Sequence, residues 1–385
     1  MKPVVVSMEY ELPTRIIFGV GEMGRLGEVA SAMGRRALVV TTPAMPHADR
    51  AAELLREAGC EVTGCCEVEP NPRAPTIDAA AAEAQQKGVQ VVIGIGGGSA
   101  IDGAKGISLA AVNDGPVWEY TIEFRGEMRE ACVQPLPLVA IPTTAGTGTE
   151  VNHIAVISNP ETDQKGPLRC QEMAPDVAII DPELTLSLPE EITAATGFDA
   201  FTHAFERFFS PELHPFVHTL AADTMQTVYG FLGRALAEPE DIEARGRLSW
   251  AATEGAMCVL APLGEAGLHI FGLPISALFD TAHGVTLAIM IPGVLGHLCE
   301  AFPDRCAELA KILGEPGLDV APEACLGAME RWLREIGMEY RLGDAGATEA
   351  DCARLAAAIN TDRLNDRYHR SMTVEEIQEF YRSRL

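Results

Sequence analysis

Long uninterrupted apolar runs and an excess of basic side chains are both missing from this chain of 385 residues. No apolar run approaches the roughly 18 residues that a membrane-spanning helix needs, so we expect no transmembrane helix. Lysine and arginine total 29 against 55 aspartate and glutamate residues, which gives a net charge of −26 at pH 7. Because nucleic acids and anionic membrane surfaces bind clustered cations, we expect neither as a partner.

A targeting segment and paired cysteines are missing as well. Only a short apolar run precedes Glu9 and Glu11, and it does not resemble a signal peptide. None of the ten cysteines belongs to a CxxC pair, although Cys65 and Cys66 are adjacent. We therefore predict a cytoplasmic protein whose cysteines are reduced and mostly packed as small apolar side chains.

The first half of the chain alternates apolar runs with helical patterns. Continuous runs of Val, Ile and Leu are typical of parallel strands that helices cover on both faces. The pattern predicts a doubly wound α/β dinucleotide-binding domain over residues 1–185. We expect its strands at residues 36–42, 89–96, 136–142 and 176–182.

From about residue 186 the sequence changes character. Helical patterns follow one another to residue 385, and strand signals are few. One helix start is indicated by Ser187 as the capping residue, Pro189 at the entry and two glutamates in the first turn. We predict an all-α C-terminal domain over residues 186–385, without internal repeats or a long linker before it.

A glycine-rich turn follows the strand expected at residues 89–96. Gly97 and Gly98 would let the backbone approach a pyrophosphate, and the next helix offers N–H groups at its positive end. Ser99 stands where the pattern G-x-G-x-x-G has its last glycine, so a tight turn without a ligand stays an alternative. A second loop, at the end of the next strand, supplies the hydroxyl groups of Thr143, Thr144 and Thr147. Ligands of open α/β sheets bind at this end of the strands.

One carboxylate and three imidazoles stand out in the second half. Asp199 and His203 are four apart, so a helix would place both on one face. His269 and His283 are fourteen apart. Oxygen and nitrogen ligands of this kind suit a borderline divalent ion such as Fe²⁺ or Zn²⁺. The same spacings also allow a helix-surface pair, a core histidine and a loop histidine.

A second pair of histidines shares the four-residue spacing. Pro215 lies between His214 and His218, so we expect this pair at a solvated helix start. Spacing alone therefore does not single out the ligands among nine histidines. The others are expected in surface or packing roles, at His47, His153, His297 and His369.

Five motifs occur in a fixed order along the chain: GGGSAIDGAK, IPTTAGTGTEV, DPELTLSLP, GFDAFTHAFE and DTAHGVTLAIMIP. Together they resemble the iron-containing (group III) alcohol dehydrogenases, in particular the butanol-dehydrogenase-like members. The resemblance covers nearly the whole chain. It implies Fe²⁺, or else Zn²⁺ or another divalent metal, held by Asp199, His203, His269 and His283.

The same resemblance implies a nicotinamide cofactor, NAD or NADP. The glycine-rich turn would bind its pyrophosphate, with Asp102 nearby. The threonine loop would contact its phosphate and nicotinamide side, and Asn71 its adenosine half. The residues implied in cofactor binding are Thr42, Asn71, Gly97, Gly98, Ser99, Asp102, Thr143, Thr144 and Thr147.

Three positions depart from the family's usual pattern. Leu273 replaces a histidine that many members carry four residues after the third ligand, which excludes a proton relay through it. Thr42 stands where NAD-preferring members often carry an aspartate that repels a 2′-phosphate, so NADP is permitted. The segment NDRYHR (365–370) replaces the usual Asn-Pro-Arg. We also expect Leu273 and Phe271 to form an apolar wall that favours short aliphatic substrates.

The resemblance implies a metal-dependent alcohol dehydrogenase or aldehyde reductase that acts on a small primary alcohol or aldehyde. The metal would act as a Lewis acid on the substrate oxygen, and no catalytic residue beyond the metal site is expected. An active site in the cleft between the two domains is expected, as is a homodimer or larger homo-oligomer. Alternatives are a hydroxyacid–oxoacid transhydrogenase, another polyol or hydroxyacid dehydrogenase of this fold, a dehydroquinate synthase and a nucleotide-binding protein without catalysis.

Overall fold

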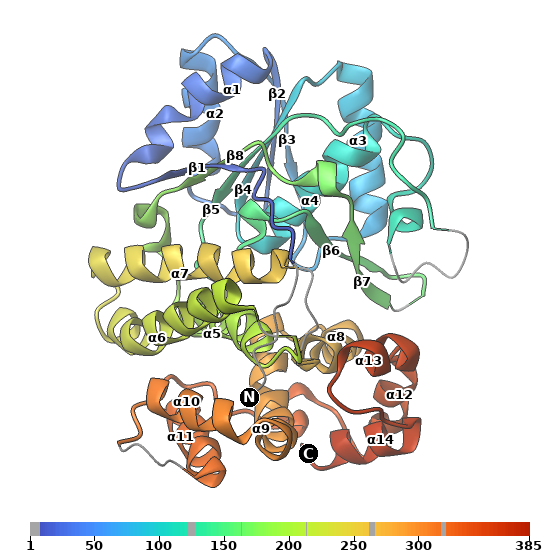
Figure 1. The fold of residues 1–385 in the computed structure, drawn as a ribbon. Coiled ribbons are helices and arrows are strands. Elements are labelled where there is room, and N and C mark those ends of the chain that lie inside the picture. The colour runs from blue at the N-terminus through green and yellow to red at the C-terminus, as the bar shows by residue number, and fades with distance from the viewer. Residues whose placement is uncertain (1–7, 122–127, 163, 213, 262–265, 317–320) are drawn as a thin grey trace. The chain divides into compact units, whose positions relative to one another are not determined.

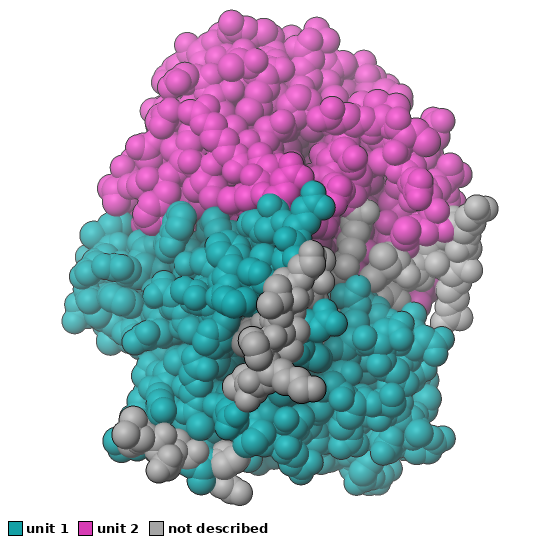
Figure 2. Space-filling model, in the orientation of Figure 1, with its two compact units in different colours: residues 1–10, 189–385 teal, residues 11–188 magenta. Residues whose placement is uncertain are grey.

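The computed structural model describes residues 8–121, 128–162, 164–212, 214–261, 266–316 and 321–385 (Figure 1). The chain forms two compact units, the α/β unit of residues 11–188 and the helical unit of residues 1–10 and 189–385 (Figure 2). The domains predicted over residues 1–185 and 186–385 stay predictions. The boundary between the compact units lies slightly later in the chain than the predicted one, and the first ten residues group with the helical unit.

A six-stranded parallel sheet forms the centre of the α/β unit (Figure 1). Its strand order is β1-β8-β5-β4-β2-β3. The strands are β1 Arg15–Phe18, β2 Arg36–Thr41, β3 Glu61–Glu67, β4 Val91–Gly96, β5 Leu138–Pro142 and β8 Val177–Ile180. The four predicted strands correspond to β2, β4, β5 and β8, and the doubly wound α/β fold class is confirmed.

Two strands of this sheet were not predicted, β1 and β3. Both lie at edges of the sheet, where one side has no neighbouring strand among the described residues. β3 begins at Glu61, ends at Glu67 and has no buried residue, so it lacks the continuous apolar run of a central strand. The antiparallel pair β6 (Ile154–Asn159) and β7 (Gln164–Arg169) was not predicted either.

Helices cover both faces of the sheet. One face packs against α1 and α2, and the other packs against α3 and α4. Successive strand residues point to opposite faces, so Val39 joins the first of these two cores and Val40 joins the second. The helices are α1 Leu26–Met33, α2 Ala48–Glu57, α3 Ala74–Lys87 and α4 Gly98–Ala110.

The helical unit contains no strand among its described residues, as predicted for this part of the chain. The Tyr10 hydroxyl donates a hydrogen bond to the Met257 carbonyl oxygen at 3.1 Å and ties the N-terminal segment to this unit. The helices are α5 Glu190–Phe208, α6 Pro215–Ala237, α7 Ile242–Leu260, α8 Leu268–Phe279, α9 His283–Ala301, α10 Pro303–Ile312, α11 Pro322–Glu335, α12 Asp351–Ala358, α13 Thr361–Arg367 and α14 Val374–Arg382.

The predicted cap of α5 is wrong. Pro189 occupies the N-cap position, and it makes no side-chain cap hydrogen bond. Ser187 lies two residues before that position, too far along the chain to act as the cap. The two glutamates predicted for the first turn, Glu190 and Glu191, do stand at the positive end of the helix dipole.

α9 is the most apolar long helix of the described chain. Its mean hydropathy of 1.5 and its length would suffice to cross a membrane, but 61% of its most apolar 18-residue window is buried inside the protein. It packs against α5, α8, α10 and α11. The helix is therefore a core element of the helical unit, and its apolar sequence follows from burial on several sides.

Candidate metal and cofactor sites

Helix α5 supplies the carboxylate and the first imidazole of the predicted metal site. Asp199 and His203 lie one turn apart, and the His203 Nε2 atom is 3.9 Å from Asp199 Oδ1. The Asp199 side chain is only 4% exposed, so its charge is shielded from bulk water. A buried carboxylate is costly unless cations or donors surround it.

Helices α8 and α9 bring the other two histidines to the same carboxylate oxygen. His269 lies in the first turn of α8, and its Nε2 atom is 3.6 Å from Asp199 Oδ1. His283 is the first residue of α9, and its Nε2 atom is 3.7 Å from that oxygen. The structure thus brings together all four residues proposed as ligands, from three helices.

Gly284 allows α9 to approach α5 closely enough for this convergence. A Cβ atom at position 284 would lie 2.1 Å from the backbone oxygen of Ala195 in α5. No side chain tolerates such a distance without moving one of the helices. The glycine directly after His283 therefore sets where that imidazole stands relative to Asp199.

The distances fit a shared cation better than direct hydrogen bonds. Donor–acceptor distances of 3.6–3.9 Å are too long for hydrogen bonds. Two ligand atoms that each lie about 2.1 Å from a tetrahedrally coordinated ion are about 3.4 Å apart. Asp199 Oδ1 and His269 Nε2 are buried and have no hydrogen-bond partner among the described residues. Buried polar atoms rarely stay in that state, so the donor set suits a divalent metal.

Glu206 orients one of these histidines and was missed from the sequence. Its carboxylate accepts the His269 backbone N–H at 3.1 Å and lies 3.0 Å from His269 Nδ1. Metal-bound histidines generally use their other ring nitrogen in this way, which leaves Nε2 directed at the ion. One signal was available, because Glu206 follows Asp199 and His203 at i+7 and i+3 on the same face of α5.

The electrostatics of the cluster favour an ionised carboxylate. Burial alone would raise the pKa of Asp199, but the imidazoles of His203, His269 and His283 hold it well below its usual range. Burial alone would lower the pKa of His269, but Glu206 and Asp199 raise it to about 10. A cation bound at this position would compensate the negative charge of the carboxylate, which protonated imidazoles otherwise compensate.

The other histidine pair lies apart from this cluster, but its environment differs from the prediction. His214 is the N-cap of α6, and its Nδ1 atom accepts the Phe216 backbone N–H at 3.2 Å. His218 is not simply solvated, because it pairs with Glu308 at 3.0 Å and stacks on Phe208. Helix α10, which carries Glu308, covers this side of α6, and the local sequence could not indicate that contact.

The predicted apolar wall is wrong for Phe271 and stays a prediction for Leu273. Leu273 is half-buried and lies one turn after His269 on α8, as its spacing required. Phe271 is fully buried and packs against Tyr368, Phe380 and Tyr381 in the core of the helical unit. Phe271 therefore belongs to the protein core, because consecutive helix residues point in different directions.

The predicted cofactor residues gather at the carboxyl ends of neighbouring strands in the α/β unit. β2, β4 and β5 are adjacent in the sheet and are followed by Thr42, Gly97 and Thr143. The Thr143 backbone N–H donates to the Gly96 carbonyl oxygen at 2.9 Å, which joins the two loops. This edge is where open parallel sheets bind nucleotides.

The threonine side chains of the second loop leave little room for a side chain at the glycines of the first loop. A Cβ atom at Gly98 would lie 2.6 Å from Thr147 Cγ2, and one at Gly97 would lie 3.3 Å from Thr144 Cγ2. Gly97 is also the N-cap of α4, so the first N–H groups of that helix point out of the same loop. The arrangement can bind an anion through backbone donors, as a pyrophosphate requires.

Asn71 and Ser99 meet beside this turn. The Asn71 backbone N–H donates to Ser99 Oγ at 3.2 Å, and Lys165 donates to Asn71 Oδ1 at 2.7 Å. Asn71 has a positive φ of 58°, a conformation that asparagine adopts more readily than most residues. The predicted adenosine contact and the predicted pyrophosphate contact are therefore neighbours in the structure.

Asp102 is engaged inside the unit. Its carboxylate accepts hydrogen bonds from Thr149 Oγ1 at 2.6 Å and from the Val156 backbone N–H at 2.8 Å. Burial raises its pKa, which the nearby Lys105 partly offsets. Lys105 is itself buried, and burial lowers its pKa to about 8. The contacts of Asp102 hold the threonine loop and β6 in place, and its cofactor contact stays a prediction.

Sequence comparison covers both units. The description "Iron-containing alcohol dehydrogenase" belongs to the family model that matches residues 13–182. The C-terminal model of the Fe-containing alcohol dehydrogenase family matches residues 193–385. The two matches together span nearly the whole chain.

Individual relatives agree with these matches. A 1,3-propanediol dehydrogenase of Klebsiella pneumoniae is 32% identical, over 90% of this chain and 91% of its own length. The NADH-dependent butanol dehydrogenase B of Clostridium acetobutylicum is 31% identical, over 90% of each chain. A halo-thermophilic archaeal alcohol dehydrogenase from a Red Sea brine pool has a similar structure, with a TM-score of 0.92 and 29% identity. That likeness covers 99% of this chain and 100% of the archaeal one.

Proposed function

Because this chain belongs to the iron-containing alcohol dehydrogenase family and is an alcohol dehydrogenase, we propose that it interconverts a small primary alcohol and its aldehyde. The observation that carries the proposal is the convergence of three imidazoles on one buried oxygen of Asp199. The family implies a divalent metal and NAD(H). We propose Fe²⁺ as the native ion, bound by Asp199, His203, His269 and His283.

The side chains of this site prepare it for one kind of chemistry. A divalent ion bound there supplies a Lewis acid for the substrate oxygen, and a nicotinamide supplies or accepts the hydride. Asp199 offsets part of the metal charge inside a buried site. Glu206 keeps His269 Nε2 directed at the ion by holding Nδ1, so the ligands need little rearrangement on metal binding.

Leu273 affects both proton handling and substrate choice in this proposal. Its side chain can neither accept nor donate a proton, so the proton of the alcohol would leave through water or, with the cofactor bound, through one of its hydroxyl groups. A leucine one turn from a metal ligand also favours the apolar part of a substrate. Relatives named for methanol, propanediol and butanol suggest alcohols of one to four carbons for this chain.

Cofactor choice rests on the end of β2. Thr42 has no carboxylate that would repel a 2′-phosphate, and no lysine or arginine stands directly beside it in the sequence to attract one. We therefore propose that the enzyme accepts NADPH as well as NADH. Backbone N–H groups of the glycine-rich turn bind the pyrophosphate in this proposal, because the overall charge of the chain is unfavourable for an anion.

The remaining parts of the proposal concern the setting of the enzyme. We propose a cytoplasmic homodimer or larger homo-oligomer whose partners are small alcohols and aldehydes. The acidic composition supports the expectation of no nucleic acid or membrane partner. The absence of a disulfide among ten cysteines is compatible with a reducing compartment.

One set of assays tests the proposed function. Apo-protein is loaded anaerobically with Fe²⁺ or Zn²⁺, and aldehydes of increasing chain length are reduced with NADH or NADPH. We expect iron-dependent turnover with either cofactor. His269→Ala should lose bound metal and turnover, whereas His214→Ala, a histidine outside the cluster, should keep both. Turnover of a hydroxyacid with an oxoacid in the absence of added cofactor would instead indicate a transhydrogenase.

A further inference from the structure

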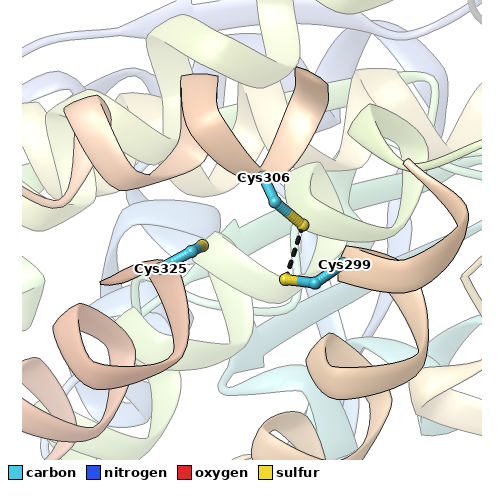
Figure 3. A group of neighbouring side chains, drawn as sticks. All are labelled: Cys299, Cys306 and Cys325. Atoms are coloured by element: carbon cyan, nitrogen blue, oxygen red, sulfur yellow. Dashed lines mark hydrogen bonds between the residues drawn. The ribbon is translucent and has the colours of Figure 1, made fainter. Parts of the chain in front are cut away.

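Three buried cysteines meet at a corner of the helical unit that the proposed dehydrogenase chemistry does not use. Cys299 lies near the end of α9, Cys306 in α10 and Cys325 in α11. Cys306 and Cys325 are 0% exposed and Cys299 is 7% exposed. Figure 3 shows the three side chains converging from separate helices.

The sulfur atoms are close enough to bind one ion together. Cys299 Sγ and Cys306 Sγ are 2.8 Å apart, and all three sulfur atoms lie within 4.8 Å of one another. Among the described residues, no histidine or carboxylate joins this group. Soft thiolate ligands select thiophilic metals, but structural Zn²⁺ sites almost always have four protein ligands. The geometry therefore favours an ion that is satisfied by three sulfur ligands.

The net charge of the buried complex further limits which ion the three sulfur atoms can bind. The hydrogen bonds of Cys306 with Cys299 and Cys325, together with burial, raise its pKa well above the usual range. Burial likewise disfavours a charged thiolate at Cys299 and Cys325. Three thiolates around Zn²⁺ would leave a net charge of −1, and around Cu⁺ a net charge of −2. Burying an uncompensated charge is costly, so a trivalent centre that gives a neutral complex is favoured.

Arsenous acid, As(OH)₃, meets this requirement without releasing or consuming charge. Three As–O bonds break and three As–S bonds form. Each hydroxyl group leaves with one thiol proton as water, so three neutral thiols and one neutral acid give a neutral complex and three water molecules. No electron is transferred. The net exchange leaves no charged thiolate in the buried site, because each thiol proton leaves in a water molecule.

We propose that Cys299, Cys306 and Cys325 form a three-sulfur site for a trivalent thiophilic ion of the arsenic(III) type. Binding would join α9, α10 and α11 at one point. The site lies at the far end of α9 from His283, so it can fill without displacing a metal ligand of the dehydrogenase site.

X-ray absorption at the arsenic edge tests the proposal on the iron-loaded enzyme treated with sodium arsenite. To remove competing thiols, the work uses a background in which Cys65, Cys66, Cys132 and Cys170 are changed to serine, because these four are exposed or half-exposed. We expect one arsenic per chain with three sulfur neighbours, and an unfolding midpoint that rises by several degrees. Bound ligand stabilises the folded state in this way.

Matched variants separate the site from general thiol binding. Cys306→Ser should weaken arsenite binding at least about tenfold and replace one sulfur neighbour by oxygen. Cys325→Ser provides the same measurement should Cys306→Ser fail to fold. Cys352→Ser removes another buried thiol in α12 and should leave arsenite binding unchanged. Dehydrogenase turnover should stay unchanged when the site is filled.

Three results would overturn the proposal. The first is equal arsenite binding by Cys306→Ser and its parent. The second is tight binding of Zn²⁺ at the three cysteines with no binding of arsenite, which would refute the charge argument. The third is a Cys299–Cys306 disulfide, detected by mass spectrometry in protein prepared without oxygen, since it would consume two of the ligands.

Discussion

The residues of the proposed metal site have two different roles. Four of them are proposed ligands of the ion, and one orients a ligand without contacting the ion. Asp199 and the three histidines meet at one oxygen, whereas Glu206 acts only through His269. This distinction matters for experiments, because losing a ligand and losing its support have different signatures. A supporting carboxylate acts on the metal through the ligand that it orients.

Glu206→Gln should weaken iron binding about 10–100-fold, because the amide holds His269 Nδ1–H less strongly than a carboxylate. At saturating iron, kcat should stay close to that of the parent. The measurement is an iron titration followed by turnover. Glu308→Gln is the matched control, since Glu308 also pairs with a histidine, His218, outside the ligand set. Unchanged iron affinity in Glu206→Gln would contradict the positioning role.

Thr42→Asp should shift cofactor preference from NADPH toward NADH. The new carboxylate would stand near the 2′-phosphate, and repulsion between two charges about 4 Å apart at an effective dielectric near 20 is up to about 4 kcal/mol. The ratio of kcat/KM values for the two cofactors measures the effect. Thr42→Asn has similar size without the charge and should leave the ratio near that of the parent. An unchanged ratio in Thr42→Asp would place the ribose elsewhere.

Glu254 on α7 predicts a pH dependence of stability. Burial, and then the charge of Asp223, raises its pKa to about 7, and Thr224 Oγ1 lies 3.2 Å from its carboxylate. Between about pH 4.5 and pH 7 the folded protein keeps a proton that the unfolded chain releases. This residue's contribution to stability is therefore fully present below about pH 4.5 and is lost as the pH rises to 7.

Glu254→Gln mimics the protonated form and should remove that loss. The unfolding midpoint of the variant should exceed that of the parent by more at pH 8 than at pH 5. Thermal unfolding of both proteins at the two pH values provides the comparison. An equal difference at both pH values would show that Glu254 titrates normally in the folded protein.

At the scale of elements, the metal site depends on how closely α5, α8 and α9 approach one another. Helix geometry explains the pairing of Asp199 with His203, since i and i+4 share a face. The other contacts depend on tertiary packing, with Gly284 against the backbone of Ala195 as the closest approach. A change at that contact should act on the metal through the position of α9.

Gly284→Ala should reduce bound iron and turnover, because the added methyl group would lie 2.1 Å from the Ala195 carbonyl oxygen and push His283 away. Gly296→Ala is the control on the same helix, where no described atom beyond the neighbouring helix backbone lies within 4 Å of the added Cβ. The control should keep its iron, and its stability should rise slightly because alanine is the better helix former. Iron content per chain and thermal unfolding are measured for both. Full iron occupancy in Gly284→Ala would contradict the argument.

At the scale of the whole molecule, the net charge of −26 opposes the approach of an anionic cofactor. Such a field slows the association of like-charged ligands, and salt screens it. The local donors of the glycine-rich turn act only over short distances, so they cannot cancel the long-range repulsion. Cofactor binding should therefore depend on ionic strength.

Raising the ionic strength from about 10 mM to about 150 mM shortens the screening length from about 30 Å to about 8 Å. The KM for NADH should then fall several-fold, whereas the KM for a neutral aldehyde should change little. Steady-state kinetics at both ionic strengths test this, with sodium chloride and potassium chloride compared to exclude a specific ion effect. A KM for NADH that rises with salt would mean that a local cationic site dominates.

Sequence by itself determined the features that local backbone geometry controls. Continuous apolar runs identified β2, β4, β5 and β8, because central parallel strands are buried on both faces. Edge strands β1 and β3 lack that burial and were missed. The motif order identified the family, and the spacing of Asp199 and His203 placed one pair of proposed ligands on one helix face.

Only the tertiary structure decided which distant residues meet. Glu206 and His269 are 63 positions apart, and their contact depends on the packing of α8 against α5. Phe271 lies in the core and not in a substrate wall, and His218 pairs with Glu308. The side chains of Cys299, Cys306 and Cys325 meet although they belong to three different helices. Helical periodicity fixes which face a side chain occupies, but it does not fix which helix covers that face. That choice follows from the packing of the whole unit.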